Sequence, residues 1–295
     1  MRPLRGLIAV ALLAGAAGWV LTRATPLPDS ALAGVQGDAA HGEQVFLAAG
    51  CASCHAAPES ADTRRLSGGQ RFVSEFGTFV APNISPDPLH GIGGWSLLDF
   101  ASALKRGVSP EGRHLYPAFP YTAYAKMTDQ DIADLWAFWQ GLPPSQVPSQ
   151  PHEVGFPFSI RRGVGVWKLL FLNDNWAMQG DLDPMVERGR YLVEAQAHCG
   201  ECHTPRGLLG QLDTGRWLAG APNPSGPGRI PGLTPGQLTW DASEIAYYLE
   251  TGFTPDYDSA GGHMAAVVGN FAQLPAEDRA AVAAYVKALK PVAAE

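Results

Sequence analysis

Cys51-Ala52-Ser53-Cys54-His55 decides how this chain folds, and Cys199-Gly200-Glu201-Cys202-His203 repeats its pattern. These two stretches hold all four cysteines of the chain. C-x-x-C-H is the attachment signature of c-type haem. Two thiols at this spacing reach the two vinyl groups on one porphyrin edge, and the next residue projects under the ring, where an imidazole binds the iron. The sequence therefore predicts two covalently bound haem c groups, attached through Cys51, Cys54, Cys199 and Cys202, with His55 and His203 as iron ligands.

Three other interpretations of the cysteines were weighed. Two disulfides are typical of exported chains, two C-x-x-C pairs can hold one zinc ion, and a single pair can be a thiol redox site. None of these explains a histidine directly after both pairs. A zinc site built from pairs 148 residues apart would leave both histidines redundant. The spacing favours haem.

Composition limits the class of protein. A length of 295 residues is enough for about two domains. The formal net charge of −7 does not favour sequence-independent binding of nucleic acid. With 34 glycines and 25 prolines, long ordered loops are expected between short helices. Haem domains need few helices because the porphyrin fills much of the core.

The N-terminus has the pattern of an export signal. Arg2 and Arg5 precede an apolar run from Gly6 to Leu21, as a positive n-region precedes an h-region. The body of the protein is therefore expected on the periplasmic side of the bacterial inner membrane, where haem is attached.

Two fates of residues 1–24 stay open, a cleaved signal peptide and a signal anchor. Ala31-Leu32-Ala33 resembles a cleavage site but lies far from the apolar run. In the anchor interpretation, Trp19 and Arg23 lie at the outer interface and extend a short membrane span. The anchor is favoured because weak cleavage motifs are common by chance. An N-terminal hydrophobic transmembrane helix attached to the inner membrane is thus expected.

Short helices and long loops are predicted for the first half, residues 36–144. Capping patterns open two helices, and glycines end them. Residues 56–94 are rich in Gly, Pro, Ser and Asn and are predicted to be loop, and no alternating pattern indicates a strand. The predicted helices run from about His41 to Gly50, from Ser96 to Arg106 before Gly107, and from Thr128 to Gly141.

The second half, residues 184–291, repeats the first. Trp240-Asp-Ala-Ser-Glu244 matches Trp95-Ser-Leu-Leu-Asp99, and a final helix is predicted from about Ala276 to Leu289. A repeat this long indicates duplicated domains. Residues 145–183 form a linker, in which the stretch from Arg161 to Leu172 is either a strap across both domains or an exposed partner or membrane surface.

The sixth iron ligand of the second haem is predicted to be Met264. It lies between the middle and last helices of its half, and methionine sulfur at the open axial position raises the potential. The alternative is a gap-filling core methionine. Met185, the competing methionine, lies upstream of the haem motif.

The first half lacks a methionine at the matching position. Phe119 stands there and cannot bind iron. Met127, eight residues further on, is the predicted ligand. In the alternative, Met127 packs as a hydrophobic staple before the Thr128 cap, and the first iron is open or bound by His114. His198 and His263 lie close enough to the motifs to tune a haem electrostatically.

The sequence resembles the dihaem and multihaem cytochrome c proteins related to the cytochrome subunits of membrane-bound bacterial alcohol and gluconate dehydrogenases. The resemblance covers residues 36 to 291. It differs from those subunits in having two motifs instead of three, and Phe119 in place of a methionine. The segments that carry it, besides the first C-x-x-C-H, are Gly77-Thr-Phe-Val-Ala-Pro-Asn-Ile-Ser-Pro86, Gly91-Ile-Gly-Gly-Trp95, Arg113-His-Leu-Tyr-Pro-Ala-Phe-Pro-Tyr121, His198-Cys-Gly-Glu-Cys-His-Thr-Pro-Arg206 and Gly262-His-Met-Ala.

This resemblance implies an all-α fold of two tandem class I cytochrome c-like domains with long loops, behind the N-terminal helix. It also implies an electron carrier without substrate chemistry, which passes electrons from a partner dehydrogenase to a cytochrome or oxidase of the respiratory chain. The alternative function is a dihaem redox enzyme, of the peroxidase or sulfur-compound oxidase type. It would use an open or labile first haem, because Phe119 leaves only that haem as a candidate.

Overall fold

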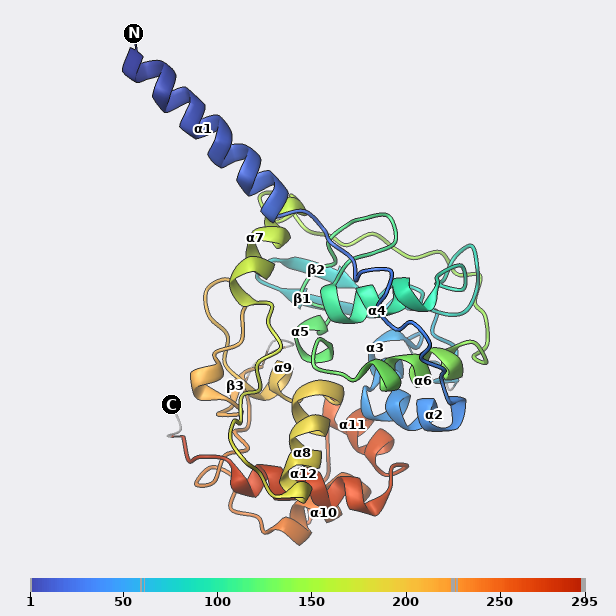
Figure 1. The fold of residues 1–295 in the computed structure, drawn as a ribbon. Helices are drawn as coiled ribbons and strands as arrows, with labels where there is room; N and C mark the ends of the chain where they lie inside the picture. Colours follow the sequence, from blue (N-terminus) through green and yellow to red (C-terminus); the bar gives the residue numbers. More distant parts are fainter. Residues whose placement is uncertain (1, 59, 61, 224–225, 227, 293–295) are drawn as a thin grey trace.

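A computed structural model describes residues 2–292 except 59, 61, 224–225 and 227 (Figure 1). A long N-terminal helix, α1 (Arg2–Leu21), projects from a body made of two helical halves joined by a linker. Each half has its own buried core, one around Phe46, Ile132 and Trp139 and one around Phe271 and Tyr285. The arrangement of two cytochrome c-like domains expected from the sequence is present.

The first half places a C-terminal helix across an N-terminal one. Gly42 lies at the closest approach, where a Cβ would stand 1.9 Å from the carbonyl oxygen of Asp134, so any larger residue forces the helices apart. The helices of this half and of the linker are α2 (Ala39–Ala48), α3 (Cys51–His55), α4 (Leu97–Arg106), α5 (Tyr121–Tyr124), α6 (Asp129–Trp139) and α7 (Arg162–Phe171).

The second half repeats this crossing. At Gly189 a Cβ would stand 2.0 Å from the carbonyl oxygen of Ala281. The chain has one residue more between Gly189 and Cys199 than between Gly42 and Cys51, and a π-helical turn absorbs it. The helical segments here are α8 (Pro184–Tyr191), the π turn η1 (Leu192–Gln196), α9 (Gly200–His203), the 3₁₀ turn η2 (Thr214–Arg216), α10 (Ala242–Thr251), α11 (His263–Phe271) and α12 (Ala276–Ala288).

The capping patterns read from the sequence are confirmed. Ser96 and Asp99 form a capping box at α4, and Asp241 and Glu244 form its counterpart at α10. The Thr128 hydroxyl caps α6. These caps satisfy backbone N–H groups that the first helical turn leaves without partners.

The fold is mostly helical, as predicted, and it also contains two short hairpins that the sequence did not indicate. The strands β1 (Arg71–Ser74) and β2 (Gly77–Val80) pair antiparallel inside the stretch predicted to be loop, and β3 (Ala221–Pro222) pairs with β4 (Arg229–Ile230). The first pair turns at Glu75 and Phe76, and Gly77, which begins β2, adopts φ +125°. Strands of two to four residues are too short to carry an alternating pattern that sequence reading detects.

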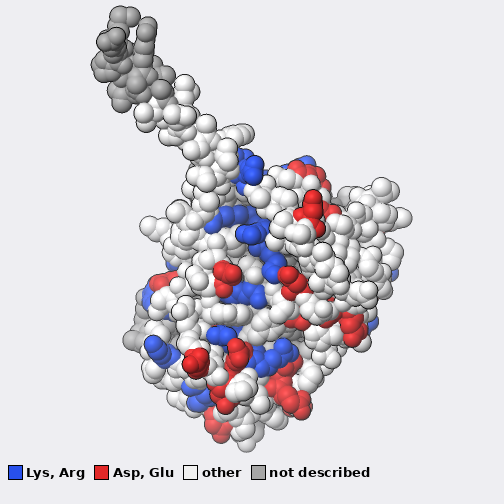
Figure 2. Space-filling model, in the orientation of Figure 1, with Lys and Arg blue, Asp and Glu red and all other residues white. Residues whose placement is uncertain are grey.

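The linker both straps the halves together and exposes an apolar face. The Trp167 indole N–H of α7 donates to the carbonyl of Leu209 in the second half at 2.9 Å. The Lys168 ammonium donates to the carbonyls of Arg106 and Gly107 in the first half. Leu170, on the outer side of the same helix, is 63% exposed. Figure 2 shows basic side chains gathered near the base of α1, with mixed charges beyond them.

The N-terminal segment after α1 belongs to the first half. Leu32 is 8% exposed within the first core, and the amide of Leu27 donates to the Ser102 hydroxyl at 3.1 Å. Arg162 of α7 donates to the Thr22 hydroxyl at 3.0 Å. In the described part of the chain, no helix is long and apolar enough to cross a membrane.

Candidate haem sites

Each C-x-x-C-H motif forms one helical turn that brings its thiols and imidazole to one side. Cys51 and Cys54 lie on α3, and Cys199 begins the turn of α9. The residue before each motif is left-handed, with φ +61° at Gly50 and φ +45° at His198. The left-handed residue ends the preceding helix and starts the motif turn in a new direction.

The two motif histidines have the orientation that an iron ligand needs. His55 Nδ1 lies 3.0 Å from the Pro82 carbonyl oxygen, and His203 Nδ1 lies 2.8 Å from that of Pro231. A carbonyl oxygen only accepts, so in both rings Nδ1–H donates and the lone pair of Nε2 is left for a metal. Burial lowers the pKa of both imidazoles, which keeps them neutral.

The thiols do not have the properties of a redox pair or a zinc site. Burial raises the pKa of Cys51 and of Cys199 to about 12 and that of Cys54 to about 11. A reactive redox thiol needs a lowered pKa, so these values do not favour a thiol redox site. None of the four cysteines forms a disulfide. Within the described residues, no three of them gather with ligand atoms close enough to share one ion. Paired thiols beside a neutral imidazole fit covalent haem.

The sixth-ligand candidates differ between the halves. Met264 is half-buried in the first turn of α11. Phe119, at the corresponding place of the first half, is also half-buried, and its ring packs 5.6 Å from that of Tyr124. The loops leading to both residues carry the same kind of bridge, Val108 with His114 and Phe253 with Ser259. Met264 stays the predicted ligand of the second haem.

The residue of the second half that corresponds to Met127 is Leu274, which is buried in the second core. Met127 is 2% exposed, and its amide donates to the Tyr124 carbonyl at 3.0 Å, directly before the α6 cap. Leu274 makes the same contact, with Phe271, directly before α12. A ligand role for Met127 stays a prediction.

His114 is turned toward the N-terminal segment. Its Nε2–H donates to the Thr22 carbonyl at 2.9 Å. A Cβ on Gly165 of α7 would stand 2.9 Å from the same nitrogen, so the ring is enclosed on that side. His114 Nε2 is therefore committed to the N-terminal segment, and the sixth ligand of the first iron stays a prediction.

The two motifs lie close to each other across the contact between the halves. His198 Nε2 lies 3.2 Å from the Ala49 carbonyl oxygen, and the Asn270 amide donates to the Ser53 hydroxyl at 3.3 Å. The cores also interlock, since Ala48 of α2 packs in the second core and Ala195 of η1 packs in the first. Two haems held by these motifs are therefore held by adjoining segments.

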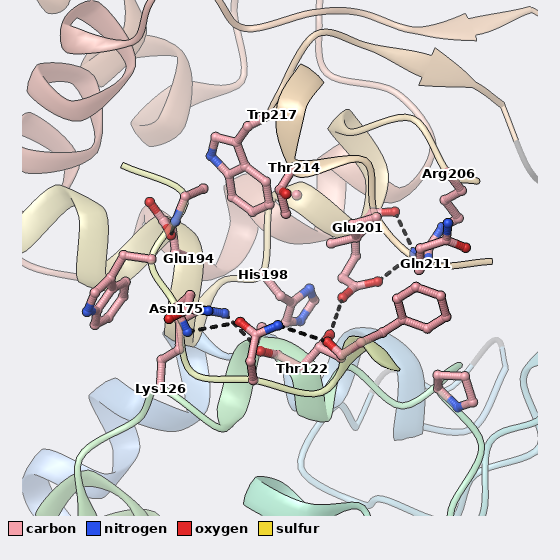
Figure 3. Close-up of a pocket in the computed structure, with 18 of the residues that line it drawn as sticks. Thr122, Lys126, Asn175, Glu194, His198, Glu201, Arg206, Gln211, Thr214 and Trp217 are labelled. Atoms are coloured by element: carbon pink, nitrogen blue, oxygen red, sulfur yellow. Dashed lines mark hydrogen bonds and ion pairs between the residues drawn. The ribbon is translucent and has the colours of Figure 1, made fainter. Parts of the chain in front are cut away.

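A polar cavity of about 490 Å³ lies beside this contact (Figure 3). The Thr122 hydroxyl of α5 donates to the Glu201 carboxylate inside the second motif at 3.1 Å, and Arg206 pairs with the same carboxylate. Burial lowers the pKa of Lys126, whose ammonium donates to the Thr122 carbonyl. The cavity walls come from both halves and from the linker.

Another polar cluster fastens the halves at α6. Asp131 accepts from the Tyr191 hydroxyl and, at 3.1 Å, from the Gln196 amide of the second half. Asp134 accepts from His41 at 2.8 Å. The His41 imidazole and the Asp131 and Asp134 carboxylates lie close together. Each carboxylate already accepts hydrogen bonds from protein donors, so the cluster joins elements of the fold.

Sequence reasoning did not identify the proline carbonyls or the His198 contact. Pro82 follows His55 by 27 residues, and Pro231 follows His203 by 28. This recurrence in the sequence could have indicated the two prolines as equivalent partners of the histidines. Backbone acceptors carry no residue-type signature, and the interface depends on tertiary packing.

Two such motifs on two copies of one small helical fold define a dihaem c-type cytochrome. The cytochrome c family model matches residues 39–143 and 186–290, and the chain belongs to the cytochrome c family. It is 57% identical over 288 residues to the "Diheme cytochrome c-type" protein of Cereibacter sphaeroides, and the match covers 97% of each chain. The chain thus carries two covalently bound haem c groups, as predicted.

Cytochrome subunits of dehydrogenases are also similar to this chain. The fructose dehydrogenase cytochrome subunit of Gluconobacter japonicus is 34% identical, over 92% of this chain and 57% of the subunit. The cytochrome c subunit of alcohol dehydrogenase (quinone) of Gluconobacter oxydans is 34% identical, over 85% of this chain and 54% of the subunit. The chain spans a little over half the length of these subunits. The predicted relationship to dehydrogenase cytochromes is confirmed.

Proposed function

We propose that this protein is an electron carrier that accepts electrons from a partner dehydrogenase and delivers them to a cytochrome or oxidase of the respiratory chain. The observation that carries the proposal is the repeated pairing of a motif histidine with a proline carbonyl, which leaves Nε2 for iron in both halves. The relatives that are subunits of fructose and alcohol dehydrogenases support a dehydrogenase as the donor.

The residues on the distal side fit transfer without substrate chemistry. Bound haem supplies one-electron exchange between Fe(II) and Fe(III). In the proposal, Met264 and Met127 would each bind one iron, which would leave no position open for a substrate. Phe119 presents only a hydrocarbon ring on its side and offers no group for proton transfer. The protein's task is then to hold the haems, exclude water and set their potentials.

The proposed location is the periplasmic side of the inner membrane. The arginines and apolar run at the N-terminus are the pattern of an exported chain. Fractionation of cells that express the full chain tests this. Haem-containing protein is expected in the periplasmic or membrane fraction, and holoprotein found only in the cytoplasm contradicts the proposal.

Reduction by a dehydrogenase tests the function. The oxidised holoprotein is mixed with a fructose, alcohol or gluconate dehydrogenase freed of its own cytochrome subunit, together with the substrate. The expected result is the spectrum of reduced c-type haem, with two electrons accepted per chain. Omitting the dehydrogenase is the control. Failure of every dehydrogenase present in the source cell to reduce the protein overturns the proposal.

Carbon monoxide separates the carrier from the enzyme alternative. The reduced carrier, with both irons six-coordinate, is expected to bind carbon monoxide weakly at either haem. Strong binding at the first haem indicates an open iron beside Phe119 and favours the redox enzyme.

A further inference from the structure

The residue before each haem motif has the same backbone conformation but a different side chain in the two halves. Gly50 adopts φ +61° and His198 adopts φ +45°. Glycine takes the left-handed region without cost, whereas a residue with a Cβ is strained there. The second half therefore carries a strained histidine where the first half shows that glycine serves the fold. Strain of this kind persists only where the surroundings hold the residue in place.

The His198 side chain makes a contact that glycine cannot make. It reaches from the second half to the first, where its Nε2–H donates to the Ala49 carbonyl at 3.2 Å. The same carbonyl accepts from the Tyr124 hydroxyl at 3.2 Å, and the Tyr124 and His198 rings pack edge to face with centroids 5.7 Å apart. Figure 3 shows the imidazole lying between the second motif and α5. The ring is thus held by a hydrogen bond and a ring contact together.

The contact joins the two haem-binding segments directly. His198 precedes Cys199, and Ala49 stands two residues before Cys51. A second bond, from Asn270 to Ser53, ties α11 to the first motif. The motifs are held as one unit at their adjoining ends.

We propose that His198 is a positioning residue that fixes the two haem-binding motifs relative to each other and so sets the rate of electron exchange between the two haems. In that exchange one electron leaves the Fe(II) of one haem and reduces the Fe(III) of the other. No bond forms or breaks and no proton moves. The part of this proposal that concerns electron exchange rests on the proposed electron-transfer function. The positioning of the two motifs by His198 is a property of the fold and does not depend on it.

The test compares three variants of the full-length holoprotein. His198→Gly removes the bridge and relieves the strain, as in the first half. His198→Asn tolerates the left-handed backbone but is too short to reach Ala49. Tyr257→Gly is the matched control. Tyr257 is also left-handed, at φ +64°, but its side chain is 96% exposed and does not join the two halves.

Amide hydrogen exchange of residues 47–55 and flash-photoreduction kinetics between the haems are the two measurements. Both His198 variants are expected to lose protection in that segment by about fivefold to tenfold, as for one buried hydrogen bond, and to slow interhaem exchange severalfold. The spectra of both haems and the Tyr257→Gly control stay unchanged.

Unchanged protection and unchanged interhaem kinetics in both His198 variants overturn the proposal. If His198→Gly fails to retain haem, the proposal is decided by hydrogen exchange and interhaem kinetics of the His198→Asn variant. Photoreduction needs no partner protein, so a failure of dehydrogenase-driven reduction refutes the proposed function without touching this result.

Discussion

Gly42 and Gly189 are the same residue at the same helix crossing in the two halves, whereas Gly50 and His198 share a backbone conformation and differ in side chain. The crossing tolerates no Cβ in either half, so both copies keep glycine. The position before the motif faces the other half, so the two copies differ. Duplication has preserved what one domain needs to fold, and the copies have diverged where they meet.

The π turn η1 is a second such difference. Its extra residue leaves Glu194 buried, where the carboxylate accepts from the Tyr285 hydroxyl at 2.6 Å and from the amide of Met178 in the linker at 3.0 Å. The first half has Phe138 where the second has Tyr285, at the matching place on the last helix. The second half thus uses a polar anchor for the linker that the first half lacks.

The largest expected effect comes from filling the helix crossings. Gly42→Val and Gly189→Val each drive a side chain into the carbonyl of the crossing helix, at a cost of about 3 kcal/mol. A fall in Tm of roughly 10 °C is expected for each in thermal unfolding of the holoprotein. Gly163→Ala in α7 is the control, because nothing lies within 4 Å of its added Cβ. Equal Tm values for the crossing variants and the wild type would refute the shared architecture.

The methionine ligands come next. Met264→Leu and Met127→Leu are each expected to abolish the red-region sulfur–iron charge-transfer band of one haem. Each should lower that haem's potential by on the order of 0.1 V, because axial ligands set the potential. Leucine suits the position of Met127 because Leu274 stands there in the second half. Met185→Leu, at a side chain 43% exposed, is the control. A retained band in Met127→Leu rejects that ligand.

Tyr285→Phe makes the second half resemble the first. The hydroxyl donates to Glu194 and accepts from the Trp217 indole at 2.9 Å, so its loss leaves a buried carboxylate short of a donor. Destabilisation of about 2 kcal/mol is expected, measured by chemical unfolding. The reverse change in the first half, Phe138→Tyr, adds a hydroxyl to a half-buried ring and serves as the comparison. A neutral Tyr285→Phe result would mean that the π turn does not anchor the linker.

The smallest expected effect is the pH dependence of the α6 junction. Burial alone would raise the pKa of Asp134, but hydrogen bonds from the Asp38 amide, His41 and Gln130 outweigh it and hold the pKa below its usual value of 3.8. A carboxyl whose folded pKa is depressed stabilises the fold above its unfolded pKa and loses that contribution as the pH falls through the folded value. Asp134→Ala, the residue type of Ala281 in the second half, should cost about 1 kcal/mol at pH 6 and less at pH 3. A cost independent of pH contradicts this assignment.

Local signals were sufficient to predict much of this molecule. The two C-x-x-C-H motifs, the capping box at Ser96 and the cap at Thr128 each lie within a few residues of the groups they serve, so sequence alone reveals them. The Pro82 and Pro231 acceptors are backbone atoms distant in sequence from their histidines. The contact of His198 with Ala49 exists only after both halves have folded, so no local pattern contains it.

The other limit was alignment of the two halves by one spacing, the 145 residues that separate Phe119 from Met264. The repeats after the middle helices align well, as at Gly107 and Gly252, but the shorter α5 and the longer α11 change the register before the last helices. That spacing relates Met264 to Phe119, whereas Met127 corresponds to Leu274 at a spacing of 147 residues, which the backbone hydrogen bonds of the structure reveal. An extra residue within a helix is recognised from the backbone hydrogen bonds of the folded chain.

The packed segment between α1 and the first half has a consequence for maturation. A signal peptidase that cut after Ala33 would discard Leu32, and with it roughly 2 kcal/mol of apolar burial from the first core. It would also remove the Thr22 carbonyl, which accepts the hydrogen bond from the His114 ring. If the chain is exported as proposed, the mature polypeptide is therefore expected to keep its residues from Thr22 onward, and N-terminal sequencing of the purified holoprotein reads the processing point directly.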